Sequence, residues 1–133
     1  MAAQRRLKTA SLFAAMRISA PSAVAGAPLA EFLSIIRGNQ DIMGTLIFGG
    51  VFDRFPDIKL YFAETNASWL PFTLFFMDDN HEIFSTAFGG RKMELTPSEY
   101  VAKHCHFSII RDPVAVQIAD LLPVDNLMWG SDF

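Results

Sequence analysis

The chain has 133 residues, of which 51% are hydrophobic and 13% aromatic, and its formal net charge is −3. A chain this apolar can bury a core, so the composition excludes a disordered protein and indicates a single domain. Charged residues interrupt every apolar stretch before it reaches about 18 residues, which excludes a membrane-spanning helix. Beyond Arg5, Arg6 and Lys8 no cluster of basic residues offers a footprint for phosphate groups, so a nucleic acid is not an expected partner either.

Residues 1–27 form an N-terminal arm that is rich in Ala and Ser. Its basic start and short apolar run imitate a secretory signal, but Arg17 interrupts the run early. We therefore favour a loosely ordered arm, or the remains of a truncated element, over a cleaved signal. Cys105 is the only cysteine, which is typical of a reducing compartment, and we expect a cytoplasmic protein.

The pattern becomes regular from Pro28, where apolar residues recur at helical spacing as far as Ile47 and predict a long amphipathic helix. A helical turn over residues 51–55 follows, and Pro56 ends it. The β-type run over residues 59–63 then predicts a short strand that ends at Glu64. Asn66 or Ser68 is expected to cap the next helix, whose apolar residues extend over 69–77.

Two further helix starts are marked by a capping residue followed by proline. Thr96 with Glu99 forms a capping box around Pro97, and a short helix leads into an alternating strand over residues 105–110. Asp112 repeats the signal before a helix over 114–122, and residues 126–130 predict the last strand. Strands that alternate with helices predict an α/β protein with a parallel sheet, either doubly wound or a barrel.

Two of the three predicted strands end near a carboxylate, Glu64 and Asp132. Ligands bind at the carboxyl ends of strands in parallel α/β folds, so both residues are candidates for the site. His104 and His106 form an H-x-H pair, which on one strand places both imidazoles on one face and can hold a divalent metal. The pair lies at the start of its strand, however, and we interpret it as a partly exposed pair at the amino ends of the strands, away from the site. Cys105 between them is expected to be a buried, inert thiol.

Four segments stand out in chain order: GVFDRFPDIKL at residues 50–60, FAE with ASWLP at 62–71, PSEY at 97–100 and VDNLMWGSD at 124–132. Together they resemble the C-terminal half of the amidohydrolase-related family, in the branch that includes aminocarboxymuconate-semialdehyde decarboxylase and related aromatic-acid decarboxylases. The resemblance covers residues 28–133. It implies a partial TIM-type barrel made of about the last three to four strand and helix units.

The resemblance also implies a divalent metal, zinc or manganese, at the carboxyl ends of the strands. Asp132 falls on the aspartate of the family's G-[ST]-D motif, which implies that Asp132 binds the metal and accepts a proton from metal-bound water. Many relatives carry a histidine where this chain has Glu64, and a carboxylate there implies a contact with the substrate or with metal-bound water.

The chain departs from the family pattern in its metal ligands. The H-x-H of the family's first strand and the histidine that ends its fifth strand have no counterpart, and residues 16–19 stand where the fifth strand is expected. One carboxylate does not hold a zinc ion that normally has three or four protein ligands. A complete barrel needs about 250 residues, so we expect roughly half a barrel with two unpaired edges and an uncovered face.

Three functions remain open on the sequence. The first is a portion of a metal-dependent carboxy-lyase acting on a small aromatic or unsaturated carboxylic acid. The nearest rival is a metal-dependent hydrolase that opens a lactone or an amide. The third is a catalytically silent fragment that pairs with itself, or with a complementary half, to close a barrel. For the chain alone the missing ligands favour silence over activity, so whether it is an enzyme stays open.

Overall fold

The computed structural model describes residues 9–11 and 32–131, and the following elements belong to these residues. The strands are β1 (Thr9–Ser11), β2 (Lys59–Phe62), β3 (Cys105–Ile109) and β4 (Leu127–Trp129). The α-helices are α2 (Leu33–Phe48), α3 (Val51–Arg54), α4 (Leu70–Phe84), α5 (Pro97–His104) and α6 (Pro113–Gln117). Two short 3₁₀ helices, η1 (Ala119–Leu121) and η2 (Val124–Asn126), connect α6 to β4.

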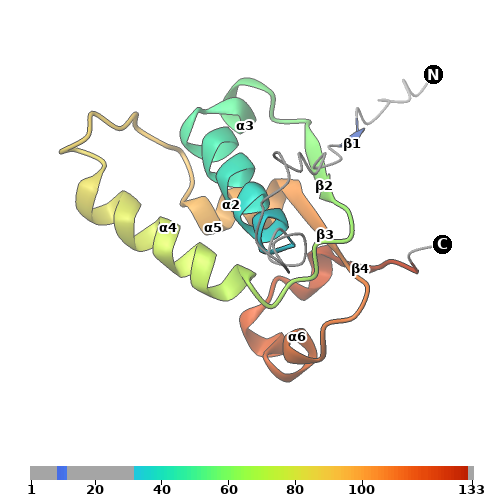
Figure 1. Ribbon diagram of the computed structural model, residues 1–133. Helices are drawn as coiled ribbons and strands as arrows, with labels where there is room; N and C mark the ends of the chain where they lie inside the picture. Colours follow the sequence, from blue (N-terminus) through green and yellow to red (C-terminus); the bar gives the residue numbers. More distant parts are fainter. Residues whose placement is uncertain (1–8, 12–31, 132–133) are drawn as a thin grey trace, which may run out of the picture.

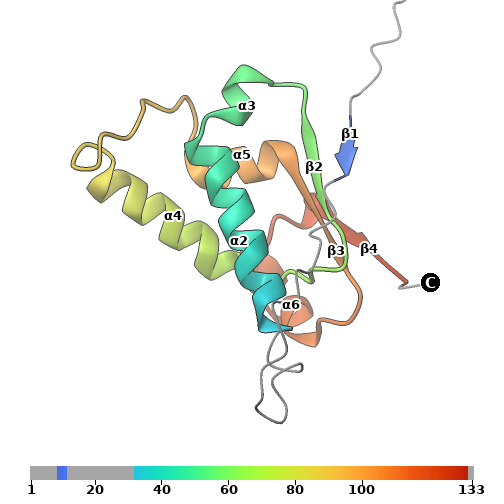
Figure 2. The same cartoon turned by 45° about the horizontal axis from the view of Figure 1, so that its top comes forward.

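The four strands form one parallel sheet in the order β1-β2-β3-β4, which is their order in the chain. The helices α2, α4 and α5 all lie on the same side of this sheet (Figures 1 and 2). A complete doubly wound sheet reverses its strand order and carries helices on both faces, and the described residues show neither feature. The sheet is not closed, because β1 and β4 form its two edges.

The core lies between the sheet and the helices on that side. Leu60 and Phe62 of β2 are buried, and their register partners in β3, Cys105 and Phe107, are fully buried. Side chains of the helices pack against this row, and the cluster also contains Met43, Ile47, Phe52, Ala67, Leu70, Met77, Tyr100, Val101, Ala115 and Leu122. The alternation of buried and half-buried residues along β2 shows that one face of this strand carries the core.

The other face of the sheet carries Tyr61, His106, Ser108 and Met128, which are register neighbours across β2, β3 and β4. No described helix covers this face (Figure 2). Tyr61 and His106 are half-buried and Met128 is exposed. Parallel sheets in stable proteins are covered on both faces, so we expect this face to pack against further structure that the described residues do not supply.

Most predicted elements are confirmed, with shifted ends. The long helix predicted from Pro28 is α2, and residues 28–31 lie outside the described residues. The capping box at α5 is present in both directions, since Thr96 and Glu99 each accept a backbone N–H of the other. Within the part of the chain that the structure describes, no helix is long and apolar enough to cross a membrane.

Two predictions about elements differ from the structure. The helix expected over residues 114–122 ends at Gln117 and tightens into η1, because Pro123 forces Leu122 into an extended conformation and shortens the last turns. The strand β1 lies inside the N-terminal arm, where no strand was predicted at residues 9–11. The stretch 16–19, expected at the fifth strand position, lies outside the described residues, as does most of the arm.

Candidate functional site

Glu64 stands just beyond the carboxyl end of β2, where the sequence predicts a site residue. Its side chain is exposed, and its backbone is in the left-handed region with φ of 60°. A non-glycine residue in this conformation needs support from its surroundings. That support is a hydrogen bond of 2.6 Å, which the backbone N–H of Glu64 donates to the hydroxyl of Ser108 in β3.

Ser108 connects the ends of three strands. It is 1% exposed, and its carbonyl oxygen accepts the backbone N–H of Asn66 at 3.1 Å in addition to the bond between its hydroxyl and Glu64. On the β4 side it faces Gly130, where a Cβ atom would lie 3.2 Å from the Ser108 hydroxyl oxygen. The Gly130 N–H in turn donates to the Ile109 carbonyl at 2.9 Å. Ser108 therefore fixes the spacing of the segments that carry Glu64 and lead to Asp132.

The loop after β2 is held by the loop after β3. Asn66 also has a left-handed backbone, with φ of 56°, and its side-chain oxygen accepts the N–H groups of Ile110 and Arg111 at 3.1 and 3.3 Å. Asp112 accepts the N–H groups of Ala67 and Ser68, both at 2.8 Å, with one carboxylate oxygen. The two loops at the carboxyl edge are thus tied together by side chains from both.

These bonds correct the predicted cap of α4. Neither Asn66 nor Ser68 caps this helix, whose N-cap is Trp69 without a side-chain hydrogen bond. The orphan N–H groups before α4 are instead satisfied by Asp112, whose other carboxylate oxygen accepts Ala115 N–H at 2.9 Å and caps α6 as predicted. The short-range capping rule failed because a residue 45 positions later in the chain supplies the acceptor.

Asp112 is ionised under ordinary conditions in spite of its burial. Burial on its own raises the pKa of this carboxyl group, but the hydrogen bonds from the backbone N–H groups of Ala67, Ala115 and Ser68 outweigh it and hold the pKa below the ordinary value. The negative charge is therefore part of the folded structure, and it organises the loops at the candidate site.

Asp132, the predicted metal ligand, lies outside the described residues. Among the residues that the structure describes, no group of three or more His, Cys, Asp or Glu side chains is placed to hold a metal ion. Glu64 is the predicted site residue whose position is described, and the segment that leads to Asp132 follows β4 two strands away at the same edge of the sheet. The structure therefore places one of the two predicted carboxylates and does not test their proximity.

His104 and His106 do not share a strand. His104 is the last residue of α5 and is 1% exposed, whereas His106 lies in β3 and is half-buried. His104 is thus more buried than the partly exposed pair that we expected. Its Nδ1 lies 2.9 Å from the Ile58 carbonyl oxygen, and its ring stacks on Phe52 with centroids 4.4 Å apart. Burial lowers the pKa of His104, so the ring is held neutral inside the core.

Cys105 is fully buried, as expected. Burial raises the pKa of its thiol to about 12, so the thiolate does not form near neutral pH. Together with the neutral His104 it belongs to the core beneath the start of β3. This part of the chain supports the sheet and offers neither a nucleophile nor a pair of metal ligands.

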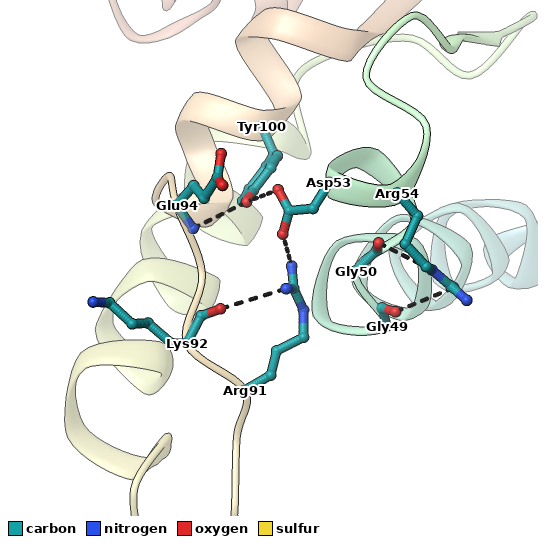
Figure 3. A network of polar contacts seen from close by, with 8 residues as sticks. All are labelled: Gly49, Gly50, Asp53, Arg54, Arg91, Lys92, Glu94 and Tyr100. Atoms are coloured by element: carbon teal, nitrogen blue, oxygen red, sulfur yellow. Dashed lines mark hydrogen bonds and ion pairs between the residues drawn. The ribbon is translucent and has the colours of Figure 1, made fainter.

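A second polar network lies before the amino ends of β2 and β3 (Figure 3). Asp53 of α3 accepts hydrogen bonds from the Tyr100 hydroxyl and from the Arg91 guanidinium, with which it forms an ion pair. The bond from Tyr100 has the largest effect in lowering the pKa of Asp53, and Arg91 adds to it. This network fastens residues 91–94 to α3 and α5, and the motif GVFDRFPDIKL contributes to it through Asp53.

The region beside this network contains an aromatic cavity of about 300 Å³, lined by Phe48, Asn80, His81, Phe84, Ser85, Phe88, Gly90, Arg91 and Met93. His81 stacks on Phe48 with centroids 6.2 Å apart. The cavity is formed by the ends of α2 and α4, which lie away from the loops that carry Glu64. It is therefore separate from the candidate site.

Ser108 and Asn66 are site-forming residues that sequence reasoning did not find. Both act through contacts that join residues 44 positions apart, and neither stands out as Glu64 does at a strand end. The sequence offers one signal for Ser108. It is a serine within a predicted strand, and a hydroxyl group that is buried in a sheet needs a hydrogen-bond partner.

Comparison with solved structures places this arrangement in a known class of fold. The chain is similar to 5-carboxyvanillate decarboxylase LigW from Sphingomonas paucimobilis over 65% of its length, at 27% identity and a TM-score of 0.55. It is also similar in fold to an amidohydrolase from Mycobacterium avium subsp. paratuberculosis K-10 over 80% of its length, at 22% identity and a TM-score of 0.63. No protein-family model matches the chain.

Both of these proteins are members of the amidohydrolase superfamily, which confirms the resemblance of this chain to a part of an amidohydrolase-related, decarboxylase-like protein. The matched region makes up 27% of the decarboxylase and 26% of the amidohydrolase. The chain thus spans about a quarter of the length of each.

Proposed function

We propose that this chain supplies an arc of a TIM-type barrel and acts, within the assembled barrel, as part of a carboxy-lyase for a small aromatic or unsaturated carboxylic acid. The observation that carries the proposal is Glu64, an exposed acidic residue whose backbone is fixed at the carboxyl edge of the sheet by the buried hydroxyl of Ser108. An acidic residue on a well-ordered backbone at this edge is typical of the catalytic loops of parallel barrels.

Two further observations support a barrel arc. The strands follow one another in chain order and the helices lie on one face, which is how a barrel winds. The similarity to a decarboxylase at 27% identity supports the choice of chemistry. In the barrel, the uncovered face with Tyr61, His106 and Met128 would be the interior.

The role of Glu64 follows from the reaction. Decarboxylation breaks the bond between the carboxylate carbon and the neighbouring carbon, carbon dioxide leaves, and the carbon that keeps the electron pair takes up a proton. Such a site needs a group that can hold a proton near that carbon. We assign this role to Glu64, because its exposed side chain leaves the carboxyl edge of the sheet, and Asp132 is the second candidate from the sequence.

The family implies a zinc or manganese ion, and the described residues do not fit a metal site by themselves. No described cluster of three ligands exists, and His104 already makes a bond from Nδ1 to the Ile58 carbonyl oxygen inside the core. A metal at the carboxyl edge would need ligands beyond Glu64 and Asp132. Metal binding by the isolated chain is therefore not part of the proposal.

The second candidate is a chain that is catalytically silent on its own. The lack of a ligand cluster among the described residues favours it. In that case the chain contributes its edge loops only after a complementary half completes the barrel. A hydrolase acting on a lactone or an amide is the remaining alternative within the same fold.

The test is an activity screen of the purified chain, with and without added zinc or manganese. Aromatic carboxylic acids are followed by release of carbon dioxide, and lactones and amides by hydrolysis. We expect decarboxylation that falls at least about 100-fold in Glu64→Gln, as is usual for loss of a group that transfers a proton. The matched control is Glu82→Gln on the exposed side of α4, which should leave the rate unchanged.

The outcomes separate the candidates. Hydrolysis without decarboxylation would replace the lyase by the hydrolase. No turnover, together with no metal by elemental analysis, would support the silent chain. Decarboxylation that is equally fast in Glu64→Gln would contradict the role given to this residue.

A further inference from the structure

The described sheet has two free edges that are complementary. β1 is paired only with β2, and β4 only with β3. Each edge presents backbone N–H and C=O groups that a neighbouring strand would satisfy, and an exposed parallel edge is a liability that proteins normally cover. Because the two edges lie on opposite sides of one parallel sheet, the β4 edge of one molecule can pair in parallel with the β1 edge of another.

The exposed side chains of β4 show how incomplete this edge is. Trp129 is 78% exposed although its register partner is Ile109, on the face that the helices cover. Met128, on the uncovered face, is 42% exposed. A strand beyond β4 would cover both, since each side chain in a sheet packs against neighbours on two sides.

The number of strands matches half of a barrel. Eight parallel strands in chain order close a TIM-type barrel, and the described residues contribute four such strands. A twofold rotation about an axis along the barrel keeps every strand parallel, and it brings β4 of each copy against β1 of the other. Two identical seams then close the assembly, which leaves no free edge.

We propose that two copies of this chain associate by this twofold rotation into one eight-stranded barrel. The proposal rests on the barrel arc in the proposed function, and it names the partner as a second copy. The uncovered faces of both copies become a shared interior, in which Tyr61, His106 and Met128 of each copy pack. Both copies of Glu64 then lie around one mouth, so the candidate site is complete only in the dimer.

One backbone group at the β4 edge allows a specific test. Successive N–H groups along a strand point to opposite sides, and the N–H of Gly130 points to β3, where it bonds to Ile109. The N–H of Trp129 therefore points to the free edge. Trp129→Pro removes this donor without removing a bond to β3, and proline is tolerated where an edge N–H faces outward.

The first measurement is the mass in solution by sedimentation or light scattering at micromolar concentration. We expect twice the monomer mass of 14.8 kDa. Trp129→Pro should raise the dimer dissociation constant at least about tenfold, because one hydrogen bond is lost at each of the two seams. The control Trp129→Val keeps the N–H and suits a strand, so the comparison separates loss of the backbone donor from loss of the ring. Far-UV circular dichroism confirms that both variants fold.

A second measurement fixes the arrangement. In the proposed barrel, cysteines introduced together as Ser11→Cys and Met128→Cys lie on neighbouring strands of different copies and are joined by oxidation or a short bifunctional maleimide. Neither substitution alone gives a cross-link, since the two β4 strands lie on opposite sides of the barrel. The native Cys105 is buried and does not compete.

Each outcome decides the proposal. A monomer at all accessible concentrations, a Trp129→Pro variant with the mass and affinity of the control, or a cross-link formed by Met128→Cys alone would overturn it. The last result would indicate β4 paired with β4 in antiparallel fashion. These measurements do not depend on turnover, so a dimer without activity would reject the proposed chemistry and keep the assembly.

Discussion

The hydroxyl of Ser108 accepts the backbone N–H of Glu64, so the conformation of the candidate site residue depends on a side chain in the neighbouring strand. A buried donor that loses its acceptor costs more than the average hydrogen bond, because no water replaces it. At the residue scale, the site is therefore maintained by a residue that itself faces no solvent.

We predict that Ser108→Ala lowers the free energy of unfolding by about 1–2 kcal/mol, because it removes the acceptor for Glu64 N–H. Urea unfolding measures this change, and amide hydrogen exchange should show faster exchange at Glu64. Thr86→Ala, at an exposed position, should stay within about 0.5 kcal/mol of the parent. Unchanged exchange at Glu64 would contradict the assigned bond.

His104 gives a prediction about pH. Its pKa is lowered in the folded state from 6.5, so near and below pH 6.5 the unfolded state binds more protons than the folded state. The contribution of the neutral ring is complete above pH 6.5 and is lost as the pH falls through the lowered pKa. We expect the free energy of unfolding to fall between pH 7 and pH 5, with a smaller fall in His104→Gln.

The control for this pH experiment is His106→Gln, in which the fall should persist, because His106 is half-buried and lies outside the helix–sheet core. Equal pH dependence in the parent and in His104→Gln would show that other groups cause it. His104→Gln should also lose about 1–3 kcal/mol at pH 7, since it removes a ring that stacks on Phe52.

At the residue scale, the sequence predicts where a residue lies in the fold better than it predicts which residue it bonds to. Glu64 could be predicted because it follows a β-type run, and Cys105 because a lone cysteine in a strand is usually buried. The hydrogen-bond partner of Glu64 could not be predicted, because Ser108 lies 44 residues further along the chain and a single serine in a strand does not indicate which group it bonds to. Asp132 stays a prediction.

At the scale of elements, Asp112 joins two helix starts that are far apart in the chain. One carboxylate oxygen receives the N–H groups that precede α4, and the other caps α6. The loops after β2 and β3 therefore share one acceptor, and neither can rearrange alone without exposing buried N–H groups. The two loops at the carboxyl edge of the sheet are therefore structurally coupled through Asp112.

We predict that Asp112→Ala lowers the free energy of unfolding by about 3 kcal/mol, more than the usual cost of losing one helix cap, because three N–H groups lose their acceptor. Chemical denaturation at pH 7 measures the loss. Asp120→Ala, at an exposed position in η1, serves as the control and should change little. An Asp112→Ala variant as stable as the control would show that water replaces the carboxylate.

The same residue predicts acid sensitivity. The pKa of Asp112 is lowered in the folded protein, so its contribution is present above the ordinary value of 3.8 and is lost as the pH falls through the lowered pKa. The parent should therefore lose more stability below pH 4 than Asp112→Ala does. Denaturation curves at pH 5 and pH 3 for both proteins test this difference.

Local signals predicted the elements whose ends are set locally. The capping box of α5 and the Asp112 cap of α6 are examples, since both depend on residues within one helical turn. The residue that satisfies the N–H groups before α4 and the strand β1 were not predicted, because the first is a distant carboxylate and the second is a three-residue strand recognisable only by its pairing with β2.

At the scale of the whole molecule, the sheet has a helix-covered face and an open one. The order of elements predicts a parallel sheet but leaves a barrel and a doubly wound sheet both open, and only the resemblance to the amidohydrolase-related family implied a partial barrel with an open sheet. The choice between them depends on strand order and on which side the helices occupy, and neither is encoded in the hydrophobic period of a single element.

We predict a gradient of protection across the sheet in amide hydrogen exchange. Strand β3 has neighbours on both sides and should exchange slowly, whereas the outward N–H of Trp129 should exchange at least about 100-fold faster than that of Phe107 when the chain is monomeric. Dilution to the monomer followed by exchange and mass spectrometry measures this. Equal protection at Trp129 and Phe107 in the monomer would mean that the β4 edge is covered within one chain.

The close approach of Gly130 to Ser108 makes the two positions mutationally interdependent. Gly130→Ala places a methyl group 3.2 Å from the Ser108 hydroxyl oxygen, whereas without that oxygen the nearest Ser108 atom is its Cβ, at 3.5 Å. Gly130→Ala therefore requires the Ser108 hydroxyl to shift by a few tenths of an ångström, and we expect it to be better tolerated after Ser108→Ala. In a library that varies both positions, substitutions at 130 would be recovered together with a smaller residue at 108, a sign of epistasis between the last two strands of the described sheet.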